Sequence, residues 1–168
     1  MQEHTLGKSS TLLTPVTIEE HRAIALALAQ QATRELLIFT QTLDHALFDN
    51  AEFEDAASHL ARRSQYAAVH ILVQDSSAAV RRGHRLVELA QRLGSRVKIR
   101  RPNDDYLDAR QSFLVADETG YLSRQFADDY ANGVAHFSDR SSARNLANFF
   151  NEVWERSEAD PQLRRLHL

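Results

Sequence analysis

One late segment constrains the fold more than any other: an apolar run, an acidic turn and a second apolar run. Residues 111–124 read QSFLVADETGYLSR, and Gly120 closes the turn. Two short apolar runs joined by a turn that contains glycine are typical of a β-hairpin. The unbroken run FLVA has no polar residue on either face, which predicts burial. We therefore expect paired strands over 111–117 and 121–124 in the core of a larger sheet.

Alternating helix and strand signals precede this hairpin, and a long helix follows it. Thr17 and Glu20 have capping-box spacing, while Asn50 and Asp139 can cap later helices. Apolar runs too short for independent helices predict strands between them. The expected helices cover 17–33, 50–60, 77–93, a segment from 139 and a brief one from 160, and the expected strands outside the hairpin cover 35–40, 68–74, 96–101 and 133–137. This order predicts an α/β fold, a mixed β-sheet of about six strands with helices on both faces.

The length and the hydrophobic content suit a single domain. The chain has 168 residues, of which 43% are hydrophobic, enough to bury a sizeable core. Residues 1–16 mix polar and apolar types without a helical period, and Pro15 lies at their end. We expect a flexible lead or a lone edge strand over 1–16 and one domain over 17–168.

The composition excludes several kinds of chemistry. The chain contains no cysteine, so disulfides, thiolate catalysis and cysteine-ligated metals are excluded. Its formal charge of −3 gives no overall reason to expect a nucleic acid or an anionic membrane as partner. No window approaches the ~18 to 20 apolar residues that span a bilayer, and the N-terminus does not read as a secretory signal. We expect a cytoplasmic protein that has no membrane span and no cofactor.

Several segments together resemble one half of the phospholipase D superfamily. They are the opening ELLIFT and AVHILVQD, the helix–strand pair GHRLVELAQRLGSRVKIR, the hairpin, and the closing segment VAHFSDRSSARNLANFFNEVWERS. The similarity extends over about 18–157, nearly the whole chain. It implies a phospholipase D-like fold, and in active members a histidine and a lysine from each of two halves act on a phosphodiester.

The catalytic motif of that superfamily is broken in this chain. Active members carry His, then Lys two positions on, then Asp five further on. With Asp117 as the Asp, Arg110 stands at the histidine position and Ser112 at the lysine position. An arginine remains protonated near neutral pH, so it can act neither as nucleophile nor as proton donor. The resemblance therefore implies a vestigial pocket and no catalytic residue; the pocket would comprise Arg110, Ser112, Asp117 and Arg124, with Thr40, Gln41 and Thr42 opposite them.

A second candidate site is the basic segment 81–101. It holds eight basic residues against one acid, Glu88. Such a surplus can bind the phosphates of a nucleotide or nucleic acid, and it is equally typical of a solvated helix and strand face. The candidate anion-binding residues are Arg81, Arg85, Arg96, Lys98 and Arg100. His70, among apolar strand residues, is more typical of a hydrogen-bonded core residue than of a ligand, and His84 has no second ligand at helical spacing, so the sequence predicts no metal site.

These observations favour a catalytically inactive binding or scaffolding module, acting on a partner protein or an anionic ligand. Active members pair two halves, and this chain supplies one, so we expect a homodimer. The resemblance extends to bacterial half-domains fused to acetyltransferase domains, which makes such a domain a candidate partner. Two alternatives remain open: a phosphodiesterase or nuclease of the superfamily, and a nucleic-acid-binding module that uses the basic segment.

Overall fold

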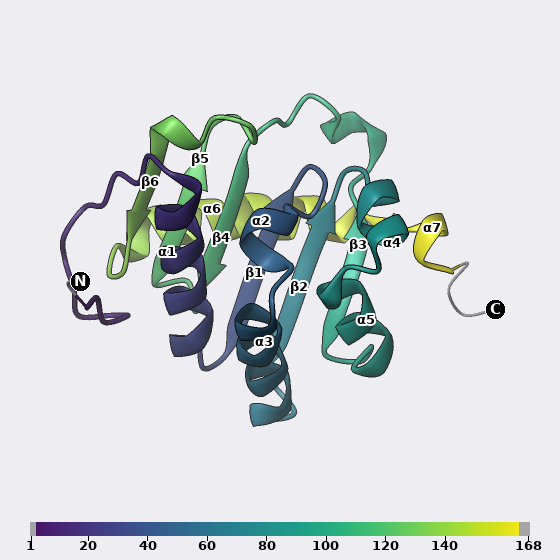
Figure 1. Ribbon diagram of the computed structural model, residues 1–168, viewed down its shortest axis with the longest axis horizontal. Helices are drawn as coiled ribbons and strands as arrows, with labels where there is room; N and C mark the ends of the chain where they lie inside the picture. Colours follow the sequence, from purple (N-terminus) through teal and green to yellow (C-terminus); the bar gives the residue numbers. More distant parts are fainter. Residues whose placement is uncertain (1–2, 165–168) are drawn as a thin grey trace.

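A computed structural model describes residues 3–164. Residues 1–2 of the expected lead and residues 165–168 of the expected domain lie outside the described chain. The described chain forms one seven-stranded sheet in the order β6-β5-β4-β1-β2-β3-β7 (Figure 1). The strands are β1 (Glu35–Thr40), β2 (Ala68–Val73), β3 (Val97–Arg101), β4 (Ser112–Ala116), β5 (Gly120–Arg124), β6 (Gly133–His136) and β7 (Glu158–Ala159). The predicted α/β fold is confirmed, with one strand more than expected.

The sheet is mixed because its two halves are connected differently. Strands β1, β2 and β3 run parallel, with Ile38 opposite Ile71 and Ile71 opposite Ile99. Strand β4 pairs antiparallel with β1, and β4, β5 and β6 continue as antiparallel neighbours. The expected hairpin is thus confirmed, and its first strand lies beside the central strand β1.

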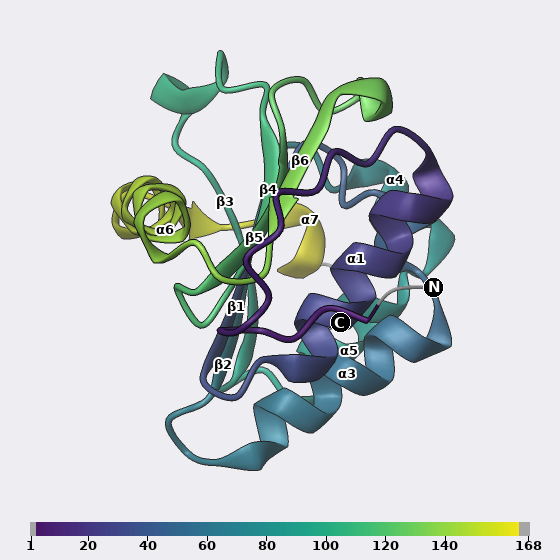
Figure 2. The ribbon, with the colours of Figure 1, turned by 90° about the vertical axis from the view of Figure 1, so that its left-hand side faces the viewer.

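Helices cover both faces of the sheet, as the sequence predicts. Helix α6 (Arg140–Glu155) lies alone on one face, and the other helices except the terminal α7 lie on the opposite face (Figure 2). The latter are α1 (Ile18–Gln31), α2 (His45–Phe48), α3 (Ala51–Arg63), α4 (Ser77–Arg82) and α5 (Arg85–Arg92); α7 spans Pro161–Arg164. Each face buries its own apolar cluster, centred on residues such as Ile38 and Phe53 under α1–α5 and on Phe39 and Phe150 under α6.

The predicted helix starts agree with the structure. Thr17 and Glu20 cap each other reciprocally at the start of α1. The Asn50 side chain accepts from the Phe53 amide at 2.9 Å, and the Asp139 side chain accepts from the Ser142 amide at 3.1 Å. These short-range contacts satisfy amides that have no partner inside the helix.

The single helix expected over 77–93 is wrong, because the chain breaks it into α4 and α5. Gly83 adopts a left-handed conformation, with φ of 68°, and ends α4. His84 then takes an extended conformation, and its Nδ1 accepts from the Leu86 amide at 3.1 Å to cap α5. Glycine enters the left-handed region without the steric cost that other residues meet there, which explains the position of the break.

The seventh strand was not predicted. Strand β7 pairs antiparallel with the end of β3, opposite Arg100 and Arg101. The Arg100 guanidinium donates to the Ser157 hydroxyl and carbonyl, both at 2.7 Å, and so holds this segment against the sheet. Strand β7 has only two residues and is held by a contact with a distant residue, so it leaves no periodic signal in the sequence.

The hairpin turn also differs from the expectation that Gly120 closes it. Asp117 and Glu118 are the central turn residues, with φ of 55° and 49°, and Gly120 is already in β5. A Cβ atom on Gly120 would lie 2.6 Å from the Leu6 side chain and 2.9 Å from that of Leu28. Glycine is therefore required here for close packing against the N-terminal segment and α1.

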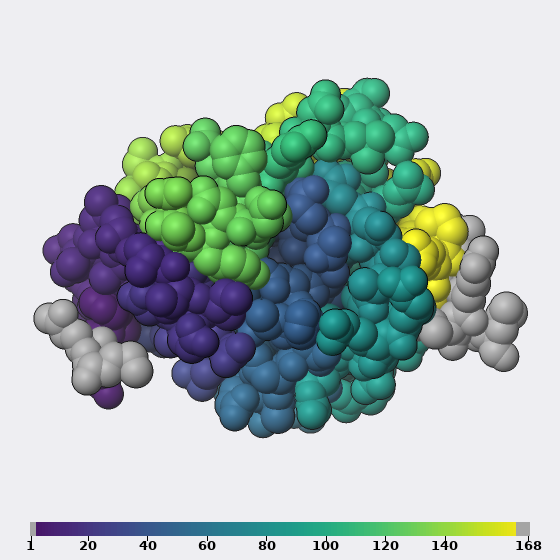
Figure 3. Space-filling view, turned by 45° about the horizontal axis from the view of Figure 1, so that its top comes forward, coloured from purple at the N-terminus to yellow at the C-terminus, as the bar shows by residue number. Residues whose placement is uncertain are grey.

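The N-terminal segment, for which the sequence left open a flexible lead or an edge strand, lies along β6. Leu13 and Ala135 exchange two backbone hydrogen bonds of 2.8 Å, and the Gly7 amide donates to the Phe137 carbonyl at 2.8 Å. The purple N-terminal residues lie directly against the green residues of the β5–β6 region in the space-filling view (Figure 3). No helix in the described part of the chain is long and apolar enough to span a bilayer.

Candidate functional site

A cleft of about 620 Å³ opens at the edge of the sheet where β1 and β5 end and β4 begins. Because β4 and β5 run antiparallel, the start of one and the end of the other lie at this edge, Ser112 being opposite Arg124. The lining residues come from the last residues of β1 and β5, from the segments that follow these strands, and from the loop that precedes β4. They are Thr40, Gln41, Thr42, Asp44, Leu107, Arg110, Arg124, Phe126, Ala127, Asp128 and Tyr130.

Arg124 is held inside the wall of this cleft by several contacts. Its side chain is only 4% exposed, and its Nη2 lies 2.9 Å from Asp44 Oδ2. Its Nε donates to the Ala127 carbonyl at 2.6 Å, and its guanidinium lies 4.2 Å from the centre of the Tyr130 ring. The Tyr130 hydroxyl donates to the same Asp44 carboxylate. Burial lowers the pKa of Arg124, whereas Asp44 opposes that shift.

The imidazole beside this cluster lies outside the cleft lining. His21, on α1, is fully buried, and its Nε2 forms a 2.8 Å hydrogen bond with the Tyr130 carbonyl. Burial lowers the pKa of His21, and the positive charge of Arg124 lowers it further. A neutral imidazole that packs behind Tyr130 supports the wall and does not face the cavity.

Arg110 differs from Arg124 because its charge faces solvent. It is exposed at the cleft, and it forms no ion pair within residues 3–164. The neighbouring polar groups are partly occupied: the Gln41 amide donates to the Ala109 carbonyl at 2.9 Å, and the Thr40 hydroxyl accepts from the Leu43 amide at 3.2 Å. Thr42 is exposed beside them. Within the described chain, the cleft thus offers the Arg110 guanidinium and the Thr42 hydroxyl, beside the exposed carboxylate of Asp128.

Five of the seven residues predicted for the vestigial pocket meet at this cleft, and two do not. Arg110, Arg124, Thr40, Gln41 and Thr42 all line it. Ser112 is 3% exposed in β4 and lies outside the lining, so the lysine position of the motif is covered.

Asp117 is also absent from the cleft, because it lies at the opposite end of β4. Its carboxylate accepts from the Thr33, Arg34 and Glu35 amides at 2.8–3.0 Å and from the Thr33 hydroxyl at 3.1 Å. It joins the hairpin turn to the start of β1. Four donors saturate this carboxylate, which leaves a structural role.

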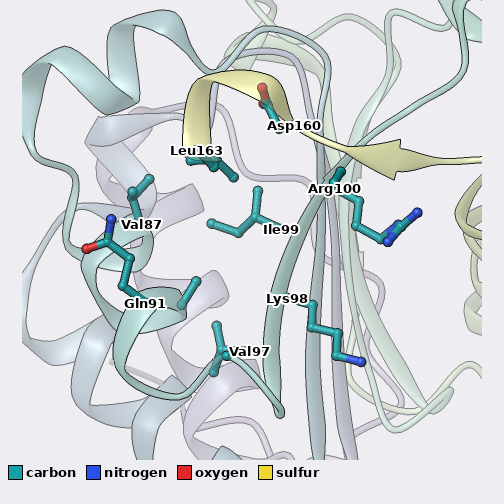
Figure 4. Close-up of a pocket in the computed structure, with 11 residues that line it drawn as sticks. Val87, Gln91, Val97, Lys98, Ile99, Arg100, Asp160 and Leu163 are labelled. Carbon is teal, nitrogen blue, oxygen red and sulfur yellow. The ribbon is translucent and has the colours of Figure 1, made fainter. Parts of the chain in front are cut away.

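The five predicted anion-binding residues do not form one patch. Arg85 faces α3, where it pairs with Glu54 at 3.5 Å, and Arg81 is exposed on α4. Arg96 donates to the Ala61 carbonyl at 3.1 Å. Lys98 and Arg100 point to the other face of the sheet, away from Val97 and Ile99 (Figure 4). Alternation along β3 separates them from the helical arginines, so the local charge surplus is divided between two faces.

Sequence reasoning missed several residues of the cleft. Asp44 and Tyr130 hold Arg124, and Leu107 and Phe126 are 59% and 49% exposed at the rim. They lie on irregular loops that no periodic pattern identifies, although an exposed aromatic in a polar loop is a usable signal. Among the described residues, no group of three or more potential ligands could hold a metal ion.

The fold is similar to that of solved phospholipase D family structures. Nuc from Salmonella typhimurium, a phospholipase D family member, is similar with a TM-score of 0.64 and 12% identity, over 88% of this chain and 96% of that chain. NucT from Helicobacter pylori is similar with a TM-score of 0.63 and 11% identity, over 90% of this chain and 98% of that chain. The predicted resemblance is confirmed for the fold, and at these identities it establishes the fold alone.

The chain belongs to the family described as Domain of unknown function (DUF7931), whose model matches residues 17–166. A third similar structure is TrmBL2, an archaeal chromatin protein that shows a novel mode of DNA binding. Its TM-score is 0.63 at 16% identity, over 95% of this chain, which spans only 57% of that chain. No curated protein matches this sequence.

Proposed function

We propose that this protein is a non-catalytic phospholipase D-like domain, which binds an anionic ligand in the cleft at the end of β1. The observation that carries the proposal is Arg110, an exposed guanidinium in that cleft, where the motif of active relatives has a histidine. A guanidinium binds carboxylate or phosphate through a fixed fork of donors and exchanges no proton near neutral pH. An arginine at this position can therefore bind an anion but is not suited to catalyse its hydrolysis.

The other lining residues narrow the class of ligand. Leu107 and Phe126 place apolar surface at the rim, and Thr42 adds a hydroxyl. Arg124 adds little attraction for an anion, because Asp44 already neutralises it. The described lining holds no imidazole and no amine. The ligand class that fits is a single anionic group attached to an apolar or planar body.

1-Naphthyl phosphate is a suitable probe, since it joins a phosphate to a planar ring. In an amide-resolved NMR titration, we expect saturable shifts at Thr42, Phe126 and Ala127. Arg110→Gln should weaken binding roughly tenfold, the value of one charge-assisted contact, whereas Arg144→Gln on the exposed part of α6 should not. Equal affinity in the wild type and Arg110→Gln, measured from the shifts at Thr42, Phe126 and Ala127, would refute the proposed site.

The enzymatic alternative makes a separate prediction. A phosphodiesterase of this superfamily would hydrolyse bis(p-nitrophenyl) phosphate, and the activity would depend on the cleft. We expect no turnover above buffer, because the described lining holds no imidazole and Asp44 is bound by Arg124 and Tyr130. Hydrolysis that disappears in Arg110→Gln would establish the enzyme instead.

The homodimer belongs to the same proposal. Leu107 and Phe126 expose apolar surface around the cleft, the region where the resemblance implies that two halves pair. We expect light scattering after size exclusion to give twice the chain mass, and Phe126→Glu to shift it toward one chain mass. A partner protein such as an acetyltransferase domain would use the same surface. A wild-type monomer at high micromolar concentration would remove the dimer from the proposal.

A nucleic-acid-binding module is the second candidate, favoured by the likeness to TrmBL2. Lys98 and Arg100 on β3 lie on the side of α6, where Arg100 is 5.7 Å from the Trp154 ring centre. Duplex DNA binding that falls steeply with salt, and with Lys98→Glu plus Arg100→Glu, would support this candidate. Unchanged binding in that variant would exclude it.

A further inference from the structure

The opposite edge of the sheet carries a second cavity, which contains two arginines without acidic partners. It has a volume of about 490 Å³ and is lined by Leu6, Gly7, Gln31, Thr33, Arg34, Asp117, Thr119 and Arg140. Arg34 lies immediately before β1, and Arg140 is the first residue of α6. Both are exposed, and neither forms an ion pair in the part of the chain that the structure describes.

A short chain of hydrogen bonds links the two guanidiniums. Arg34 Nη2 donates to the Asp117 carbonyl at 3.1 Å, and the Thr119 hydroxyl donates to the same carbonyl at 2.9 Å. Arg140 Nη1 in turn donates to the Thr119 hydroxyl at 3.1 Å. Thr119 is 4% exposed, so it is a fixed link between the two side chains. Within residues 3–164 each guanidinium makes one hydrogen bond, and its remaining donors can meet a ligand.

The acids nearest to this pair do not neutralise it directly. The Asp117 carboxylate already accepts four hydrogen bonds from residues 33–35 and turns only its main-chain carbonyl to Arg34. Glu35 and Glu118 do not line the cavity; burial raises the pKa of Glu35, and the nearby charge of Arg34 opposes that shift. The Asp139 side chain caps α6 through the Ser142 amide. Two like charges that line one polar cavity favour binding of an anion.

We propose that Arg34 and Arg140 form a binding site for a phosphomonoester dianion. Two guanidinium forks supply charge and donors for a group with two negative charges and three terminal oxygens. The amino end of α6 contributes a favourable dipole at Arg140. Gly7, with φ of 83°, and Leu6 close one wall, so a bound ligand would also contact the N-terminal segment. This site is separate from the cleft at Arg110 and does not depend on it.

Phenyl phosphate, a monoester, and dimethyl phosphate, a diester with one charge, distinguish the possible ligands. At constant ionic strength with chloride as the balancing anion, amide NMR should show saturable shifts at Gly7, Asp117 and Thr119 with the monoester. Arg34→Gln and Arg140→Gln should each weaken this binding roughly tenfold, as expected when one charge-assisted contact is lost. The spectrum itself reports whether each variant is folded.

Two control variants make the outcome specific. Arg144→Gln removes an exposed charge from the same helix, and Arg110→Gln removes the charge of the other cleft; both should leave the shifts at Thr119 unchanged. If Arg144→Gln weakens phenyl phosphate binding as much as Arg34→Gln and Arg140→Gln do, net charge explains the effect and the site is refuted. Absence of saturable shifts would also overturn it. Binding of dimethyl phosphate as tight as that of phenyl phosphate would refute the monoester class and point to a nucleic-acid backbone.

Discussion

Arg110 and Arg124 lie in the same cleft, yet their neighbours give them different roles. Arg124 is 4% exposed and is bound by Asp44, Ala127 and Tyr130. Its charge is therefore neutralised within the wall of the cleft. Arg110 is exposed and forms no ion pair within the described chain. Removing Arg124 would leave the half-buried Asp44 without its counter-ion, which costs stability. Only the exposed arginine can change its partner without disturbing the fold.

The catalytic motif cannot be restored simply by replacing residues at the aligned positions. Ser112 is 3% exposed in β4, so Ser112→Lys would bury an ammonium without a partner. We expect this variant to lose about 3 kcal/mol or more of unfolding free energy in urea denaturation. Arg110→His, at an exposed position, should change that free energy by less than about 0.5 kcal/mol. A stable variant that combines Arg110→His with Ser112→Lys and hydrolyses bis(p-nitrophenyl) phosphate would contradict this expectation.

At the scale of elements, local signals identified most helices and strands. Thr17 and Asn50 cap helices through contacts three residues away, which a sequence displays directly. The paired strands of the hairpin were equally evident from their apolar runs. The missed features depend on distant residues: β7 is held by Arg100, and Gly120 is required by Leu6 and Leu28. In the cleft, Asp44 and Tyr130 could not be inferred because the loops that position them have no period.

The hairpin turn tests the cost of a left-handed backbone. Glu118 has φ of 49°, a region that costs a residue with a Cβ about 1 kcal/mol or more. Glu118→Gly should therefore raise the unfolding free energy by about 1 kcal/mol, since glycine adopts this conformation freely. Glu118→Ala is the matched control, because it removes the carboxylate beside Glu35 and keeps the backbone strain. If alanine stabilises as much as glycine, charge repulsion and not strain explains the effect.

At the scale of the whole molecule, the two edges of one sheet carry different sites. The ends of β1 and β5 form the cleft with Arg110, and the start of β1 with the β4–β5 turn forms the cavity with Arg34. The central strands join the two edges through buried apolar residues on both faces. A ligand at one site can be studied without disturbing the other, which is why reciprocal arginine variants serve as controls.

The buried histidines should make the stability of the whole domain depend on pH. Burial lowers the pKa of His84 to about 4, and its Nε2 has no hydrogen-bond partner in the described chain. Burial and Lys98 lower the pKa of His70 to about 4, where it stacks on Trp154 with ring centres 4.3 Å apart. Both imidazoles are therefore neutral in the folded protein near neutral pH. In the unfolded chain their pKa values return to about 6.5.

Between pH 6.5 and 4 the unfolded chain thus binds more protons than the folded one, so stability falls as the pH is lowered through that range. Urea denaturation at pH 7.5 and pH 5 should show a loss of roughly 1–2 kcal/mol for each of these two histidines. His84→Asn keeps a side-chain acceptor for the Leu86 amide and removes the titrating group, so its loss should be smaller than that of the wild type. If this variant loses as much stability as the wild type, His84 is not a source of the pH dependence.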